Sequence, residues 1–165
     1  MAVMHSPNKA KTVLVEQLQN HYPSISFVPG GSFIWSPAEN IVTYDLTDKK
    51  PGAFAYSLLH ELGHALLEHN NFTSDLSLVK IERDAWDMAE KIAVDYDVRI
   101  PSEHIESCID TYRDWLHARS LCPNCQQCGL QTSKTSYSCV FCRHHWAVSE
   151  SRLCRVTRRS IKKNS

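Results

Sequence analysis

The sequence lacks the long apolar runs that membrane-spanning or secreted chains carry. No run approaches the roughly 18 apolar residues of a transmembrane helix. The N-terminal stretch MAVMHSPNKAKTVLVEQLQ holds polar residues throughout, so it does not match the apolar core of a signal peptide. Glycine and proline are also scarce, with 5 and 7 among 165 residues, which excludes collagen-like and low-complexity chains. These absences predict a soluble, cytoplasmic, globular protein.

The sequence also lacks net charge, because 18 Lys and Arg residues balance 18 Asp and Glu residues. This balance conceals two unlike parts. Residues 1–120 hold 10 basic and 17 acidic side chains, a balance of −7, whereas residues 121–165 hold 8 and 1, a balance of +7. Such asymmetry suggests parts with separate roles. An acidic partner such as DNA or RNA is expected at the basic end, while a membrane partner is not expected.

Hydrophobic spacing predicts an α+β fold. Three short strands, near residues 25–27, 33–35 and 41–44, should form a small antiparallel sheet. The helix over 53–69 is apolar nearly all round, which is typical of a buried helix. Further helices are expected over residues 8–21, 75–97 and 102–120.

The buried helix contains His60-Glu61-Leu62-Gly63-His64, an HExxH motif. Positions i and i+4 share one face of a helix, so both imidazoles could bind one Zn²⁺. Glu61 sits about 100° from His60 around the helix axis. Its carboxylate could take a proton from a metal-activated water that attacks a carbonyl. The motif therefore predicts zinc-dependent hydrolysis with Glu61 as general base. The competing interpretation is a pair of hydrogen-bonded core histidines.

A catalytic zinc site needs a third protein ligand and one open position. No histidine occurs between His69 and His104, so a carboxylate is the better candidate. The apolar stripe of the helix over 75–97 has a gap that Glu82 fills, which predicts a buried Glu82. The alternative is a carboxylate at the edge of the stripe that reaches water or pairs with an arginine. The small residues Ala85 and Ala89 should let this helix approach the HExxH helix closely.

The segments HELGHALLEH and ERDAWDMAEKIA resemble the ImmA/IrrE family of bacterial metallopeptidases. The resemblance covers about residues 30–105 and includes a helix with Glu-x-x-Ala-x-x-x-Ala, here Glu82 to Ala89. It implies zinc ligands at His60, His64 and Glu82, with Glu61 as base, and a regulatory protein such as a repressor as substrate. Two features depart from the family pattern. Trp86 stands where Asn is typical, and a cysteine cluster replaces the usual regulatory domains.

Five of the seven cysteines fall within residues 122–142. An odd count with CxxC spacing in a cytoplasmic chain favours metal binding over disulfides. The pairs Cys122/Cys125 and Cys139/Cys142 are spaced as in a zinc ribbon and predict a structural Cys₄ zinc site. Tyr137 and Trp146 should cover its small core. Alternative ligands remain open, namely Cys128 in place of Cys122 and, more weakly, His144 or His145.

Together these patterns predict a metallopeptidase domain over residues 1–120, a zinc ribbon over 121–148 and a basic, flexible tail over 149–165. The expected reaction is hydrolysis of peptide bonds in a protein substrate, with one catalytic and one structural zinc ion. The alternative is a non-catalytic zinc-binding adaptor whose ribbon binds DNA or a protein. His69 is expected on the helix face opposite His60 and His64. Trp35 and Tyr44 are expected to pack in the core, and the alternative is that one of them helps to bind a peptide or an oxyanion.

Overall fold

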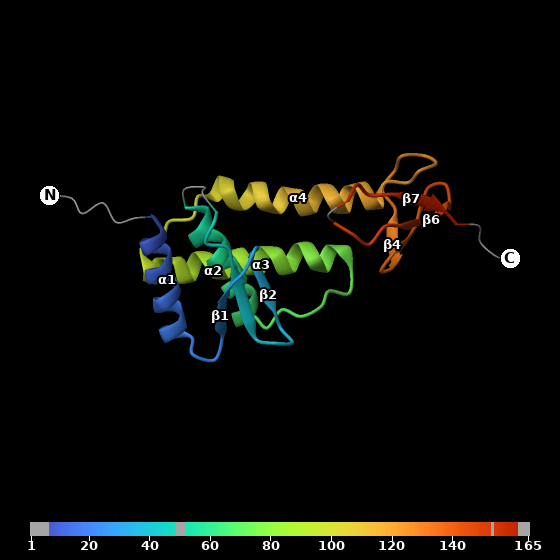
Figure 1. The fold of residues 1–165 in the computed structure, drawn as a ribbon. Helices are drawn as coiled ribbons and strands as arrows, with labels where there is room; N and C mark the ends of the chain where they lie inside the picture. Colours follow the sequence, from blue (N-terminus) through green and yellow to red (C-terminus); the bar gives the residue numbers. More distant parts are fainter. Residues whose placement is uncertain (1–6, 49–51, 153, 162–165) are drawn as a thin grey trace. The chain divides into compact units, whose positions relative to one another are not determined.

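The computed structural model describes residues 7–48, 52–152 and 154–161. Within these ranges the chain is a mixed α+β protein with four α-helices and two small sheets (Figure 1). The helices are α1 (Pro7–His21), α2 (Ala53–Leu66), α3 (Asp75–Ala93), which continues into a 3₁₀ turn, η1 (Val94–Tyr96), and α4 (Ser102–Ser120). Across the described ranges, no helix has the length and apolar character needed to cross a membrane.

Backbone contacts divide the chain into two compact units. The first contains the described residues up to Asn70 together with Ile81–Ile105, and the second contains Asn71–Lys80 and the described residues from Glu106 onward. This division runs through α3 and α4 and not along the boundary at residue 120 that composition predicts. Independent folding of residues 1–120 stays a prediction.

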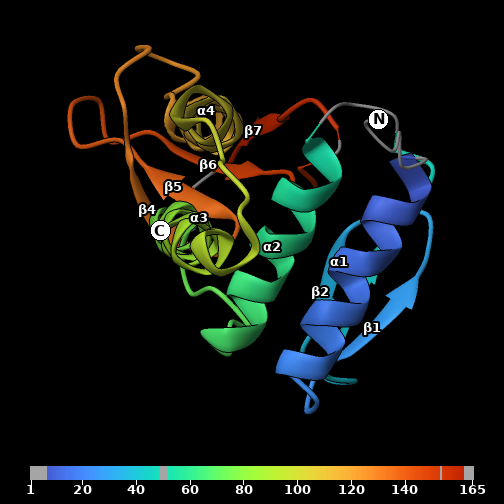
Figure 2. The ribbon, with the colours of Figure 1, turned by 90° about the vertical axis from the view of Figure 1, so that its left-hand side faces the viewer.

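The first unit holds a three-stranded sheet of β1 (Ser26–Pro29), β2 (Ile34–Ser36) and β3 (Ile41–Tyr44) in the order β1-β3-β2. β1 pairs with β3 in parallel and β2 pairs with β3 antiparallel, so the prediction of an antiparallel sheet is wrong for β1. Alternating apolar residues indicate which face a strand buries, but they do not identify its partner. The central strand β3 buries Val42 and Tyr44. α1 lies beside β1, and α2 lies beside β2 and β3 (Figure 2).

α2 buries the apolar side chains predicted for it, including Leu58, Leu59 and Leu62, but it ends at Leu66 and not at residue 69. Glu68 adopts the left-handed backbone conformation, with φ of 53°. Its N–H donates to the carbonyl of Ala65 at 3.1 Å, and the N–H of His69 donates to the carbonyl of His64 at 3.0 Å. These two bonds form a Schellman motif, which reverses the chain at the end of a helix.

α3 lies very close to α2 in the first unit. A Cβ atom on Gly63 would lie 2.4 Å from the carbonyl oxygen of Ala85, so only glycine fits at this point. Ala85 and Ala89 are fully buried, and Glu82 is buried on the same face of α3, as the apolar stripe predicts. The small residues on both helices therefore set how near the two helices come.

The second unit holds an antiparallel sheet of β4 (Leu130–Ser133), β5 (Ser136–Ser138), β6 (His145–Val148) and β7 (Arg158–Ser160), in that order. β7 belongs to the segment expected to be a flexible tail. Its residues 158–160 instead form a strand that pairs with residues 146–148 of β6. A polar, basic strand of three residues has no apolar alternation, so its sequence gives no strand signal.

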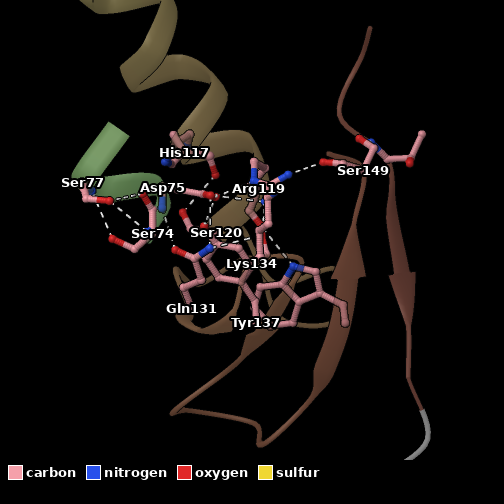
Figure 3. A network of polar contacts seen from close by, with 12 residues as sticks. Ser74, Asp75, Ser77, His117, Arg119, Ser120, Gln131, Lys134, Tyr137 and Ser149 are labelled. Atoms are coloured by element: carbon pink, nitrogen blue, oxygen red, sulfur yellow. Dashed lines mark hydrogen bonds and ion pairs between the residues drawn. The ribbon is translucent and has the colours of Figure 1, made fainter. Parts of the chain in front are cut away.

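A buried ion pair joins the start of α3 to the end of α4 within the second unit (Figure 3). Asp75 and Arg119 are each 1% exposed. The carboxylate of Asp75 accepts hydrogen bonds from Nε and Nη2 of Arg119, from the hydroxyl of Tyr137 at 2.6 Å and from Nε2 of Gln131 at 3.1 Å. Burial and the Asp75 carboxylate raise the pKa of Tyr137, so its hydroxyl remains a donor.

The remaining donors of Arg119 reach the second sheet. They bond the carbonyl oxygens of Lys134, at 2.7 Å, and Ser149, while the Arg119 carbonyl accepts a hydrogen bond from the indole of Trp146 at 2.9 Å. Ser74 and Ser77 cap the start of α3, because each side-chain oxygen accepts the backbone N–H of the other residue. This network satisfies both buried charges, which makes its loss costly.

Substitution of Gly63 by Ala should lower the free energy of unfolding by about 1–3 kcal/mol, because the new methyl group overlaps backbone that cannot move aside cheaply. The matched control is Gly31→Ala, where nothing lies within 4 Å of the added Cβ. The free energy of unfolding of the control should stay within about 0.5 kcal/mol of the parent value. Urea unfolding followed by circular dichroism measures both, and equal values for the two variants would contradict the close approach of α2 and α3.

Substitution of Asp75 by Asn should lower the free energy of unfolding by about 3–5 kcal/mol, because the guanidinium of Arg119 stays buried without a counter-charge. The control is Glu150→Gln, which removes a carboxylate 3.8 Å from Lys134 in a pair that is 66% exposed on each side. An exposed pair of this kind contributes about 1 kcal/mol or less. Denaturant titrations at constant zinc concentration compare the two variants. If Asp75→Asn lowers the free energy of unfolding by less than about 1 kcal/mol, the buried pair does not have the stabilising role given to it.

Candidate metal centres

The first unit brings His60, His64 and Glu82 together, as the sequence predicts. Nε2 of His60 lies 3.1 Å from Nε2 of His64. The carboxylate Oε2 of Glu82 lies 3.3 Å from Nε2 of His60 and 3.7 Å from Nε2 of His64. All three side chains are buried. The two histidines come from one face of α2, and Glu82 comes from the face of α3 that packs against it.

These separations fit a metal ion held by three side chains. Zinc bonds to nitrogen and oxygen at about 2.0–2.1 Å, which puts tetrahedral ligand atoms about 3.3 Å apart. The three ligand atoms lie within 4.8 Å of one another. Two imidazoles and one carboxylate are also a donor set that zinc accepts in catalytic sites. The residues present therefore fit a zinc ion.

The charge state of Glu82 agrees with a role as a metal ligand. Burial by itself would raise the pKa of this carboxyl group. The hydrogen bonds from His60 and His64 outweigh burial and hold the pKa of Glu82 well below its usual range. The buried carboxylate is therefore ionised and presents a negative charge to the two imidazoles.

Trp86 fixes the ring of His60 from α3. The two rings stack with centroids 4.2 Å apart and an angle of 26° between their planes. Nδ1 of His60 is buried and has no hydrogen-bond partner within the described residues. Metal-binding imidazoles commonly use this second nitrogen to hold their orientation. Stacking on Trp86 therefore supplies the orientation that a hydrogen bond supplies elsewhere.

His69 holds the ring of His64, and this corrects the prediction that His69 lies on the opposite face of the helix. Nδ1 of His69 is 3.0 Å from Nδ1 of His64. The prediction assumed a helix through residue 69, whereas the Schellman turn after Leu66 folds His69 back toward His64. No sequence signal marked this turn, because its left-handed position is Glu68 and not Gly or Asn. Burial and the neighbouring His64 lower the pKa of His69, which favours its neutral form.

Glu61 is positioned by the edge strand β2. Its Oε2 accepts the backbone N–H of Trp35 at 2.8 Å, and the indole N–H of Trp35 donates to the carbonyl of His69 at 2.9 Å. Trp35 is half-buried, so it links the candidate base to the end of α2 in addition to packing. Tyr44 is buried with its ring 6.0 Å from that of Phe54, which agrees with the core role expected for it.

A hollow of about 420 Å³ lies against Trp35. Residues just before β1 and around β2 line it together with the end of α2, among them Ile25, Asn40 and Ala65. His60, His64 and Glu82 do not line this hollow. Trp35 is thus shared by the hollow and by the hydrogen bond that holds Glu61.

The second unit brings together Cys122, Cys125, Cys139 and Cys142, the four ligands preferred from sequence. The sulfur atoms of Cys122 and Cys142 are 3.6 Å apart, and those of Cys125 and Cys139 are 3.5 Å apart. Zinc–sulfur bonds of about 2.3 Å put tetrahedral sulfurs about 3.8 Å apart. The cluster therefore has the size of a Cys₄ zinc site.

The alternative ligands lie outside this cluster. Cys128 is exposed, with its sulfur 3.8 Å from Nδ1 of His117. Nε2 of His144 is 3.0 Å from the hydroxyl of Ser160. Hydrogen bonds from Asn124 and from the backbone N–H of His144 lower the pKa of Cys142 to about 6, so one thiolate is available at neutral pH.

A small apolar core lies against the cysteines, as expected. Tyr137, Trp146 and Val148 are buried beside Cys122 and Cys139. The rings of Tyr137 and Trp146 stack with centroids 5.6 Å apart. Small cores of this kind commonly gain much of their folding free energy from a bound metal ion.

Comparisons with known protein families, with curated proteins and with solved structures gave no match. The resemblance to ImmA/IrrE metallopeptidases thus rests on the residues of the two motifs alone.

Substitution of Trp86 by Ala should weaken zinc binding at the His60/His64/Glu82 centre by about 10- to 100-fold, the usual effect of losing a group that orients a metal ligand. Trp86→Phe keeps an aromatic face against His60 and should stay close to the parent affinity. Competition with a chromophoric chelator measures zinc affinity while the Cys₄ site remains loaded. Equal affinity in Trp86→Ala and the parent protein would contradict an orienting role for the indole.

Proposed function

We propose that the protein is a zinc-dependent metallopeptidase. The observation that carries this proposal is the convergence of His60, His64 and Glu82 on one buried point, with ligand-atom separations of 3.1–3.7 Å. The residue directly after His60 in the motif is Glu61, whose carboxylate accepts a hydrogen bond from a backbone N–H. A purely structural metal site has no need of a base beside its ligands.

Each side chain then has a defined task. Zinc in this centre supplies a Lewis acid that polarises a carbonyl and acidifies water. His60, His64 and Glu82 would hold the ion through three side chains, the number that catalytic zinc sites use. Glu61 accepts a proton as water attacks the peptide carbonyl, and it returns that proton to the leaving amine. The hydrogen bond from Trp35 keeps the carboxylate of Glu61 in place for both transfers.

The second site has a different task in this proposal. Four cysteines would hold a zinc ion with protein ligands alone, as structural zinc sites do. Its zinc ion stabilises the ribbon around Tyr137 and Trp146 and takes no part in hydrolysis. The substrate is a protein, and the resemblance to ImmA/IrrE peptidases points to a regulatory protein such as a repressor.

Substitution of Glu61 by Gln should lower the rate of peptide cleavage by about 10²–10⁴-fold, because general-base catalysis is lost while the ligands remain. The assay incubates the zinc-loaded chain with a proteome-derived peptide library and detects new termini by mass spectrometry. The matched control is Glu90→Gln, an exposed carboxylate on α3. The control should cleave like the parent protein. Cleavage that is equal in Glu61→Gln and the parent would contradict the proposed mechanism.

The number of zinc ions bound by the parent chain and by single variants distinguishes the two sites. The parent chain should bind two zinc ions, and His64→Ala and Cys139→Ser should each bind one, because each variant breaks one of the two clusters. Glu61→Gln should keep both ions. A parent protein that holds both ions and cleaves no peptide in the library would favour a non-catalytic adaptor over the peptidase.

A further inference from the structure

The sheet of the second unit has two unlike faces. Tyr137, Trp146 and Val148 point to the buried face, so their neighbours along β5 and β6 point the other way. Strand register extends this second face to β4 and β7, because Leu130 pairs with Ser138 and Arg159 pairs with Ala147. We call it the outer face, and it comprises Leu130, Ser136, Ser138, His145, Ala147 and Arg159.

The centre of the outer face carries short side chains. Ser136, Ser138 and Ala147 are half-buried, and they lie on the two middle strands. His145 and Arg159 stand beside them on β6 and β7. An extended chain could therefore lie against the middle of this face and meet cationic groups along one side.

A loop with an exposed aromatic ring borders this face. The loop connects β5 directly to β6 and contains Val140 and Phe141, which are 61% and 71% exposed. Two backbone hydrogen bonds close the loop, from the N–H of Cys139 to the carbonyl of His144 at 2.9 Å and from the N–H of Arg143 to the carbonyl of Cys139 at 3.0 Å. The turn is held by its own backbone, so the ring of Phe141 stays in solvent.

The electrostatic balance of this region is strongly positive. Residues 121–165 contain 8 basic side chains and 1 acidic one, Glu150, whose carboxylate lies 3.8 Å from Lys134. Within the described ranges, the guanidinium groups of Arg143 and Arg159 have no ion-pair or hydrogen-bond partner and are exposed. By contrast, Arg113 on α4 is paired with Glu106 and Asp110 at 2.9 and 2.8 Å.

We propose that the outer face and the adjoining loop bind single-stranded nucleic acid. A base stacks on the ring of Phe141, and the phosphates lie against Arg143 and Arg159. Stacking on exposed aromatic rings combined with a basic track is how proteins bind single strands without reading sequence. In a duplex both faces of each base are already stacked, and an acidic peptide offers carboxylates without the matching planar rings. The proposal does not depend on the peptidase activity.

The experiment titrates the zinc-loaded full chain into a fluorescent oligothymidylate of about 12 nucleotides, within the roughly 4–16 that a small domain covers. Fluorescence anisotropy reports binding at several salt concentrations. Phe141→Ala and Phe141→Leu should both weaken binding by about 5- to 100-fold, since leucine keeps the apolar contact and loses the planar ring. Neither variant should change the salt dependence.

Arg143→Gln and Arg159→Gln should instead reduce the slope of log affinity against log salt by about 0.7 each, the value for one phosphate contact on a single strand. The matched control is Arg113→Gln, which removes the same charge from a paired arginine on α4 and should leave binding unchanged. Zinc content and circular dichroism establish that each variant is folded. Since Arg159 lies on an exposed strand, its variant keeps the test decisive if a loop variant fails to fold.

Several results would overturn the proposal. Absence of binding at low salt is one, and equal affinity in the parent, Phe141→Leu and Arg159→Gln is another. If a duplex of the same length or polyglutamate competes as well as the single strand, the attraction is charge alone and the stacking surface does not exist. Full retention of binding in Phe141→Leu, with loss in Phe141→Ala, would favour an apolar protein partner instead.

Discussion

The close approach of α2 and α3 at Gly63 determines whether the first candidate centre exists. His60 and His64 lie on α2, and their carboxylate partner Glu82 lies one helical turn before Ala85 on α3. A side chain at position 63 would collide with the Ala85 carbonyl and push the helices apart. Since metal ligands must lie within a few tenths of an ångström of their ideal positions, even a small shift would disrupt the centre.

The groups around the ligands come from three different parts of the first unit, namely the turn after α2, the strand β2 and the helix α3. The Schellman turn after α2 brings His69 to His64, and the edge strand β2 brings the N–H of Trp35 to Glu61. Trp86, one turn after Glu82 on α3, stacks on His60, whose Nδ1 has no hydrogen-bond partner in the part of the chain that the structure describes. Each ligand histidine is thus held by a different interaction, one by stacking and one by a neighbouring imidazole.

The second unit is stabilised by a different set of interactions. Its apolar core is small, and it depends on four cysteine sulfurs and on the buried Asp75–Arg119 pair. That pair satisfies its charges with Tyr137, Gln131 and two backbone carbonyls, so polar contacts supply much of the specificity that a larger core would supply. The exposed side chains of Arg143 and Arg159 take no part in these contacts, so the core does not require their charges.

The sequence by itself predicted both groups of candidate metal ligands, with Cys128 left as an alternative to Cys122. The fixed spacing of His60 and His64 on a helix, the gap that Glu82 fills in an apolar stripe, and the paired CxxC motifs are local patterns. Each follows from helix or turn geometry, so each could be recognised without a fold. The helix at Ser102–Ser120 was predicted with its observed ends, because Pro101 precedes it and an apolar stripe runs along it.

Only the tertiary structure decided which groups surround those ligands. The parallel pairing of β1 with β3, the strand β7 in the basic segment and the return of His69 to His64 depend on partners far apart in the chain or on a left-handed glutamate. Such features arise from packing and from backbone hydrogen bonds, for which residue spacing gives no signal. The sequence thus specified which atoms could bind metal, while the packing of helix on helix and strand on strand decided what holds those atoms in place.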